Sequence, residues 1–308
     1  MNYENPYSYA SSIKREPEKE KIWIRSGVKF SPCEESSPLL PPGQYSISNS
    51  NSLGVHLVKR ELNLDDLIDI KDKDTTEIIE GLEHFLKSEQ VYKDNGFLWK
   101  RGVMLWGIPG GGKTSALNLI NKYIVSSGGI SIYVDDPVLA SAGLDMVRRI
   151  QPTTTILVIL EDIDSIIYNH GESCVLSLLD GELQIKNVVF IATTNYPEKL
   201  DSRLMNRPSR FDIVRQIGIP GEESRRIYLK AKNRRLGDAA NIEELELWVK
   251  KTDGFTIAHI KELILSVECF GKTLEASIDR LISMMDGEIS SDDYAVDKIG
   301  PMGFHADI

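Results

Sequence analysis

The chain has 308 residues, of which 41% are hydrophobic and 27% charged, enough for one large domain and a smaller one with a buried core. Its net charge of -10 argues against a surface that coats DNA. The cysteines, Cys33, Cys174 and Cys269, lack the spacing of a zinc site or a disulfide framework, and no apolar run suits a signal peptide or a membrane span. These features predict a cytoplasmic protein without a membrane partner.

Residues 1–60 are predicted to be a flexible arm with a small β hairpin, which we expect to contact a partner. The segment is rich in Ser, Pro, Asn and Glu, and turn clusters separate short strand-like pieces at 22–24 and 55–58. The stretch TTEIIEGLEHFLKS, from Thr75, places apolar residues at helical spacing after a threonine cap. This pattern predicts an amphipathic helix.

The centre of the chain alternates between short apolar runs and helical segments. Such runs are typical of strands covered on both faces, so the pattern predicts an α/β three-layer sandwich with a five-stranded parallel sheet. The five runs lie at residues 103–106, 130–134, 156–160, 188–192 and 213–219. After Pro220 the pattern is helical. We expect an α/β domain over 61–220, a small all-α lid over 221–287 and a polar tail over 288–308.

The octapeptide GIPGGGKT, residues 107–114, directly follows the first apolar run and directly precedes a helical stretch. Glycines let the backbone curl so that its N–H groups point inward, and they leave room for a triphosphate. The next helix adds the positive end of its dipole. The motif matches the pattern GxxxxGK[ST] in full, so we predict a P-loop NTPase fold that binds ATP. A tight turn without a ligand is the alternative.

The motif also assigns individual roles. The Lys113 ammonium is expected to reach the β and γ phosphates, and the Thr114 hydroxyl to complete the shell of a Mg²⁺ ion. The nucleotide-binding residues predicted in this segment are Gly107, Ile108, Pro109, Gly110, Gly111, Gly112, Lys113, Thr114 and Ser115.

Three carboxylates, Glu161, Asp162 and Asp164, follow the apolar run at 156–160. The carboxyl ends of parallel strands open toward the phosphate loop, so a metal-binding acid and a catalytic base are expected there. Carboxylates this close repel one another unless a cation gathers them. A solvated strand end is the alternative.

The phosphate motif, the acidic strand end and the stretch IATTNYPEKLDSRLMNRPSRFD together resemble the AAA family of ring ATPases over residues 60–287. In that family the acids occur as Asp then Glu, the first binding magnesium through water and the second polarising the attacking water. Here the order is reversed, so the resemblance implies that Glu161 serves the metal and Asp162 the water. The order is similar to that of the branch with the mitochondrial translocase for complex III assembly. The shorter base leaves a slow or inactive ATPase as an alternative.

The resemblance also implies a sensor and arginine fingers. Asn195 matches the asparagine that orients the lytic water, although an asparagine after a strand is also a common turn residue. Arg207 and Arg210 match paired arginines that reach into the neighbour's site and neutralise charge on the γ-phosphate; two surface arginines are the alternative. One extra residue near Asn206 leaves open which is the principal finger. Fingers that act between subunits require self-association, and the resemblance implies a hexameric ring.

In the lid, TDGFTIAHIKEL resembles the family pattern DGFSGADI. The resemblance implies that the backbone near Gly254 and Ala258 approaches the base and ribose. Ala258 stands where DNA-replication relatives present an arginine, which favours the AAA group over clamp-loader or initiator types.

The segment expected to carry the pore loop has no aromatic residue between Asp135 and Pro152, so threading of an unfolded chain is not favoured. Tyr168 and His170 lie where a second pore loop would be, and a plain surface loop is the simpler interpretation. Six cationic residues at 222–235 allow a nucleic-acid contact, but a solvated helix face explains this cluster equally simply.

Two functions remain. The first is a magnesium-dependent ring ATPase that remodels or assembles a protein partner. The second is a nucleotide-controlled binding or scaffold protein, DNA-associated or not, with slow or no turnover.

Overall fold

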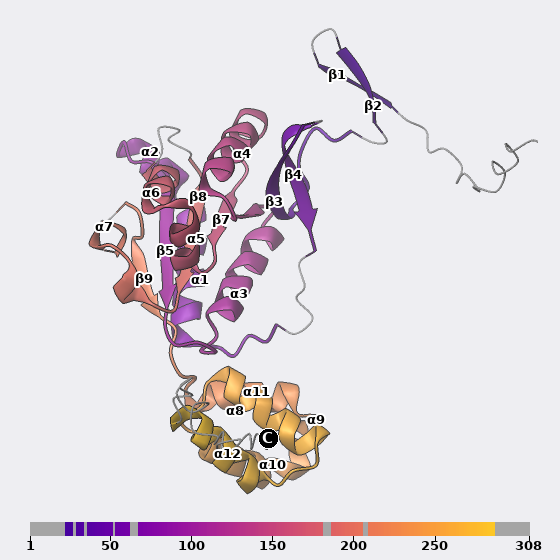
Figure 1. Cartoon of the computed structure of the whole chain (residues 1–308), viewed down its shortest axis with the longest axis vertical. Coiled ribbons are helices and arrows are strands. Elements are labelled where there is room, and N and C mark those ends of the chain that lie inside the picture. Colours follow the sequence, from indigo (N-terminus) through magenta and orange to yellow (C-terminus); the bar gives the residue numbers. More distant parts are fainter. Residues whose placement is uncertain are drawn as a thin grey trace, which may run out of the picture. The chain divides into compact units, whose positions relative to one another are not determined.

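The computed structural model describes residues 22–26, 29–33, 36–51, 53–61, 67–180, 186–205 and 209–286. The chain divides into two compact units, residues 1–41 and 42–308. In the first unit, β1 (Ile22–Ser26) and β2 (Lys29–Cys33) form an antiparallel hairpin (Figure 1). Arg207 and the polar tail predicted over 288–308 lie outside the described residues.

The second unit contains a seven-stranded sheet with the strand order β4-β3-β6-β7-β8-β5-β9 (Figure 1). The five strands predicted from apolar runs are present and run parallel to one another. They are β5 (Lys100–Trp106), β6 (Ile130–Tyr133), β7 (Ile156–Leu160), β8 (Val188–Thr194) and β9 (Ile213–Gln216). The predicted α/β sandwich is confirmed.

The predicted strand count of five is wrong, because two more strands extend the sheet at one edge. β3 (Gly43–Ser50) pairs in parallel with β6, and β4 (Gly54–Arg60) pairs antiparallel with β3. Their sequence contains many polar residues and turn formers, which are typical of loops. β3 nevertheless buries Gln44 and Tyr45, so pairing with β6 overrides the weak local pattern. Both strands fall within the segment that the sequence assigned to the arm.

Helices cover both faces of the sheet. On one face, Leu82 of α1 and Leu117 of α3 belong to one core with Ile159 and Ile191 of the central strands. α4 contacts β3, β4 and α6, and α6 contacts α5. The bounds are α1 (Lys73–Leu86), α2 (Glu89–Asp94), α3 (Lys113–Ser126), α4 (Pro137–Ile150), α5 (Ile163–His170), α6 (Glu172–Asp180) and α7 (Ser202–Met205).

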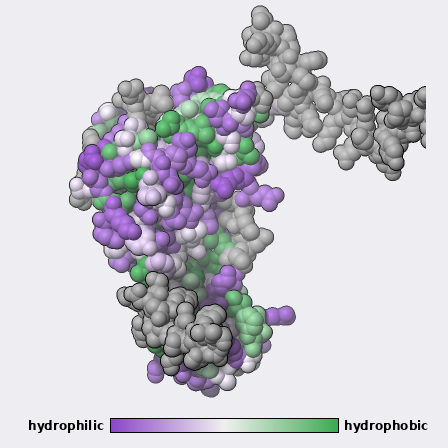
Figure 2. Space-filling view, in the orientation of Figure 1, coloured by the Kyte–Doolittle hydropathy of each residue, from purple (hydrophilic) through white to green (hydrophobic). Residues whose placement is uncertain are grey.

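The residues after Pro220 fold into a small helical lid with its own core, in which Leu245, Trp248 and Leu263 are almost fully buried. Its helices are α8 (Glu222–Lys232), α9 (Arg234–Gly237), α10 (Ile242–Lys251), α11 (Ile257–Ile264) and α12 (Leu274–Asp286), with a π-helical turn at Leu265–Cys269. Among the described helices, none is long and apolar enough to cross a bilayer. On the face shown in Figure 2, hydrophilic and hydrophobic side chains are interspersed.

Candidate active site

The phosphate loop lies between β5 and α3, and three of its glycines have backbone angles that other residues rarely adopt. The φ angles of Gly107, Gly110 and Gly112 are 151°, 74° and 109°. A Cβ at Gly107 would lie 2.1 Å from the carbonyl oxygen of Ile217. A Cβ at Gly110 would lie 2.8 Å from the Cβ of Ala258. The Ala258 N–H also donates to the Gly110 carbonyl over 3.4 Å. The loop is therefore tightly curled, with the lid against it.

The Lys113 side chain folds over this loop. Its ammonium donates hydrogen bonds to the carbonyl oxygens of Gly107 and Ile108 over 2.9 and 3.0 Å, and the residue is only 7% exposed. Burial lowers the pKa of Lys113, and the charge of Asp162 opposes that shift. A buried cation at the start of a helix suits a polyanion, whose oxygens would replace the carbonyls as acceptors.

The two residues predicted to serve a metal ion are in contact. The Thr114 hydroxyl donates to Glu161 Oε1 over 2.7 Å. A hydroxyl and a carboxylate are hard oxygen ligands of the kind that Mg²⁺ accepts together with phosphate oxygens and water. Within the described residues, no three His, Cys, Asp or Glu side chains are grouped so that they could hold a metal by themselves. This donor set fits a magnesium ion that is shared with a bound nucleotide.

Tyr133 is a neighbour of this pair that the sequence analysis did not identify. Its hydroxyl donates to Glu161 Oε2 over 2.9 Å, so each oxygen of that carboxylate accepts a hydrogen bond. Burial, followed by the charge of Glu161, raises the pKa of Tyr133. The phenol therefore stays protonated and remains a donor at neutral pH.

Asp162 begins the turn into α5 with a left-handed backbone, at φ 49° and ψ 58°. Its N–H donates to Thr193 Oγ1 over 2.9 Å, which ties the turn to the neighbouring strand β8. Burial, followed by the charges of Glu161 and Asp164, raises the pKa of Asp162. A carboxylate with a raised pKa is a better proton acceptor, which suits a catalytic base.

Asn195 follows β8 and lines a cavity of about 340 Å³ together with Lys113, Thr114 and Asp162. The amide oxygen of Asn195 is buried and has no hydrogen-bond partner among the described residues. A buried polar atom of this kind is normally satisfied by water or a ligand. The structure thus places the predicted base and the predicted sensor around one cavity beside the phosphate loop.

Of the two predicted fingers, only Arg210 can be placed. Arg210 is 4% exposed, and its guanidinium forms an ion pair with Asp180 of the same chain, with 2.9 Å between Nε and Oδ2. It also donates to the carbonyl oxygen of Arg203. In this arrangement Arg210 stabilises its own domain, and its role in a neighbour's site stays a prediction.

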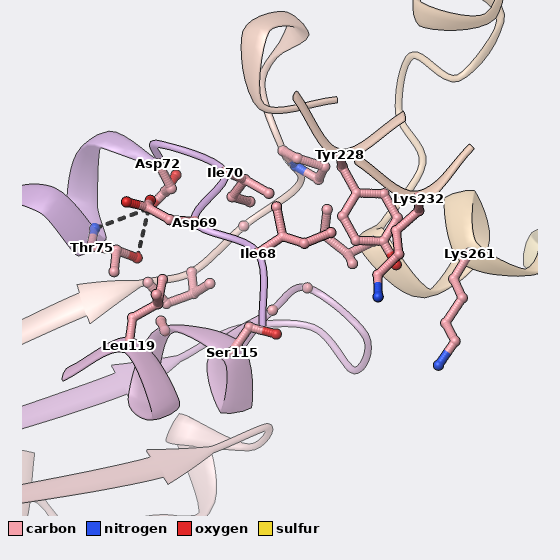
Figure 3. A pocket seen from close by; sticks show the side chains of 17 residues that line it. Ile68, Asp69, Ile70, Asp72, Thr75, Ser115, Leu119, Tyr228, Lys232 and Lys261 are labelled. Atoms are coloured by element: carbon pink, nitrogen blue, oxygen red, sulfur yellow. Dashed lines mark hydrogen bonds between the residues drawn. The ribbon is translucent and has the colours of Figure 1, made fainter. Parts of the chain in front are cut away.

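A second pocket, of about 240 Å³, lies between the phosphate loop and the lid (Figure 3). It is mainly apolar and draws on four regions: the segment that leads into α1, the phosphate loop with α3, the loop after β9, and the lid. Its lining includes Ile68, Ile70, Leu119, Ile217, Tyr228 and Lys261. None of these six is recognisable as a site residue from the sequence, because they are scattered along the chain.

The predicted lid residues lie at different distances from these pockets. Ala258 lines the cavity on the phosphate side. Gly254 forms the turn before α11, with φ 79°, and lines neither of the two pockets. Lys261, one turn after Ala258, lines both pockets, so a ligand that fills both would pass this cation.

A glycine loop lies between the parallel strand β5 and a helix, and carboxylates follow β7, two places away in the same sheet. This arrangement defines a P-loop nucleoside triphosphatase fold. Residues 103–219 match the model of the family described as "ATPase family associated with various cellular activities (AAA)". Residues 103–219 therefore carry the AAA domain of this family. The branch suggested by the reversed acid pair stays a prediction.

Individual relatives agree with this family. The chain is 30% identical over 213 residues to the ATP-dependent zinc metalloprotease FtsH of Aster yellows witches'-broom phytoplasma, 62% of this chain and 30% of that protein. It is 31% identical over 209 residues to the Cell division cycle protein 48 homolog of Archaeoglobus fulgidus, 60% of this chain and 27% of the relative. With the Proteasome-activating nucleotidase of Methanothermobacter thermautotrophicus it shares 26% over 249 residues, 74% and 58% of the two chains. The chain thus spans only part of each relative.

Proposed function

We propose that the chain hydrolyses ATP with Mg²⁺, works as a homo-oligomeric ring, and remodels or assembles a protein partner. The observation that carries the proposal is the convergence of Lys113, Asp162 and Asn195 on one cavity, with the Thr114–Glu161 pair beside it. The names of the relatives also support it, since one is an ATP-dependent protease and another a nucleotidase that activates the proteasome.

In this proposal the N–H groups of the phosphate loop and the Lys113 ammonium bind the triphosphate. Thr114 and Glu161 would hold magnesium, which supplies a Lewis acid for the phosphate oxygens. Asp162 accepts a proton from the attacking water. The amide oxygen of Asn195, which has no partner among the described residues, is an acceptor that orients this water toward the γ-phosphate.

We assign the adenine base to the apolar pocket of Figure 3. A purine has two apolar faces, and the side chains of Ile68, Ile217 and Tyr228 offer apolar contacts to them. Since the lid contributes Tyr228, binding of the base would fix the lid relative to the sheet. Changes at the phosphates could then become movement between the lid and the α/β domain.

The experiment that tests this function is phosphate release by the full-length chain and by Asp162→Asn, with nucleotide binding measured in parallel. The unmodified chain is expected to release phosphate, and Asp162→Asn to bind ATP with similar affinity but release phosphate about 100-fold more slowly. Particle images of Asp162→Asn with ATP would show the ring. Equal turnover per chain at dilutions that separate the subunits would contradict the shared site.

The second candidate is a nucleotide-controlled scaffold, and the short Asp162 side chain at the position of the base favours it. Nucleotide binding without turnover in the unmodified chain would establish this alternative. Nucleic acid remains a weaker partner, because Arg226 of α8 pairs with Glu222, Glu223 and Glu246 within the lid. Much of the charge that suggested such a contact is therefore already neutralised.

A further inference from the structure

Two residues outside the predicted site connect its metal-binding carboxylate to the edge of the sheet. Tyr133 ends β6, and its hydroxyl donates to Glu161 over 2.9 Å. Arg60 ends β4, the edge strand, and its guanidinium carbon lies 5.0 Å from the centroid of the Tyr133 ring. All three side chains line one cavity of about 430 Å³. A continuous series of contacts therefore runs from β4 to Glu161.

A second contact joins β3 to the helix of the phosphate loop. The Asn121 amide of α3 donates to Gln44 Oε1 of β3 over 2.8 Å, and both residues are buried. Separation of a buried polar pair leaves both groups unsatisfied, which is strongly unfavourable. Beyond β4, the chain reaches Ile68, which lines the apolar pocket. The edge pair of strands, β3 and β4, thus contacts α3 through Gln44 and reaches Glu161 through Arg60 and Tyr133.

The length of the Glu161 side chain explains why such support matters. A glutamate has one more rotatable bond than an aspartate, so it loses more conformational entropy when its carboxylate is fixed. Here both carboxylate oxygens are held, one by Thr114 and one by Tyr133. A Thr114 hydroxyl that binds magnesium through its oxygen would keep its proton and could still donate to Glu161, so Tyr133 supplies the second donor, on the other oxygen of the carboxylate.

We propose that Tyr133 is a positioning residue that holds the Glu161 carboxylate for magnesium, and that Arg60 holds the Tyr133 ring. The inference rests on the proposed magnesium-dependent function. A cation near an aromatic ring polarises the phenol and restricts the ring, which strengthens the hydroxyl as a donor. The edge pair of strands is thereby part of the nucleotide site.

The test is a magnesium titration of the full-length chain, read from the binding of a fluorescent ATP analogue. In Tyr133→Phe the Mg²⁺ concentration at half-saturation is expected to rise about three- to tenfold, because one hydrogen bond to a charged group is lost. The affinity measured in EDTA is expected to stay unchanged. Tyr123→Phe on α3 is the matched control and is expected to behave like the unmodified chain.

Arg60→Gln is expected to raise the same half-saturation point by less, about twofold, since it removes only the contact with the ring. Lys59→Gln on the same strand is its control and is expected to leave the value unchanged. In a Glu161→Gln background, Tyr133→Phe is expected to add nothing, because Tyr133 acts through that carboxylate.

Three outcomes would overturn the inference. In the first, the Mg²⁺ concentration at half-saturation rises in Glu161→Gln but is unchanged or lowered in Tyr133→Phe. This result contradicts the role of Tyr133 and leaves the proposed function intact. A lower melting temperature without any change in the magnesium dependence assigns Tyr133 a purely structural role. If analogue binding by the unmodified chain does not respond to Mg²⁺, the proposed function fails and the inference fails with it.

Discussion

The two ends of the nucleotide site are built in different ways. The phosphate end consists of one continuous loop and the ends of β7 and β8, and its contacts are made by backbone groups, hydroxyls and charges. The end to which we assign the base, called the base end, consists of apolar side chains from distant parts of the chain, including Ile68, Ile217 and Tyr228. One end is a local motif, whereas the other exists only after the lid and the sheet have folded together.

The difference implies that the two ends contribute differently to nucleotide recognition. Charge and backbone N–H groups act on the phosphates of any nucleotide, so the phosphate end should supply most of the affinity and the chemistry. The base end should distinguish ATP from a bare polyphosphate through burial of apolar surface. Substitutions at each end can therefore be separated with two ligands, ATP and inorganic tripolyphosphate.

Lys113→Ala is expected to have the largest effect. Loss of the cation that folds over the loop should reduce hydrolysis about 1000-fold and weaken binding of ATP and tripolyphosphate alike, about 100-fold. Calorimetry with both ligands and a phosphate-release assay would measure this. Lys122→Ala, an exposed lysine on the same helix, is the control. Tripolyphosphate binding that survives in Lys113→Ala would contradict the division between the two ends.

The phosphate end could be predicted from the sequence because its parts are contiguous or follow buried strands. Glycines at 107–112 and the carboxylates after β7 leave a recognisable pattern. Tyr133 could not be predicted in this way, since its partner Glu161 is 28 residues away and no local sequence motif distinguishes a tyrosine at a strand end. Pairing across the sheet makes that contact.

The base end and the edge strands left weaker signals. Ile68 and Ile70 alternate with the charged residues Asp69 and Lys71 in a short segment that has the composition of a loop, although the alternation is a sign that one face is buried. β4 is the edge strand and β3 lies next to it, and most of their residues are half-buried or exposed, which permits polar side chains there. In both cases tertiary packing, and not local preference, determines the structure.

Substitutions of Arg207 and Arg210 test whether an arginine of a neighbouring subunit completes the phosphate end. Arg207→Ala is expected to lower hydrolysis about 100-fold or more with an unchanged melting temperature, as for a finger that acts between subunits. Arg210→Ala is expected to lower the free energy of unfolding by about 2 kcal/mol, since it removes the ion pair of a buried guanidinium with Asp180, and the value is small because Asp180 is one third exposed.

Phosphate release and thermal unfolding of both variants would separate the two roles, and Arg215→Ala is an exposed control. A stable Arg210→Ala protein without activity, beside an active Arg207→Ala protein, would reverse the assignment. In that case the Arg210–Asp180 ion pair must open when the ring assembles.

Ile68→Ala is expected to have an intermediate effect that is confined to the base end. Removal of about three methylene-sized groups from the pocket should raise the Kd for ATP about tenfold, while the Kd for tripolyphosphate stays within about twofold. The two affinities would be measured by calorimetry. Ile150→Ala, an exposed isoleucine at the end of α4, is the control. An equal loss for both ligands would mean that Ile68 supports the loop rather than the base.

The smallest expected effect concerns the stability of the nucleotide-free chain at the phosphate end. Because the pKa of Asp162 is raised in the folded state, folding favours the protonated carboxyl over the ionised one. The protonated carboxyl therefore stabilises the fold at low pH, and this contribution is lost as the pH rises through the folded pKa. Asp162→Asn removes the charge, and asparagine tolerates the left-handed backbone at this position. The variant should therefore melt about 1–2 °C higher than the unmodified chain at pH 8, and the difference should shrink toward pH 4. Thermal unfolding across this pH range, with Asp279→Asn as an exposed control, measures the difference. A variant that melts lower at pH 8 would show that the Asp162 charge is stabilised by its surroundings, and the base would then be weaker than the geometry indicates.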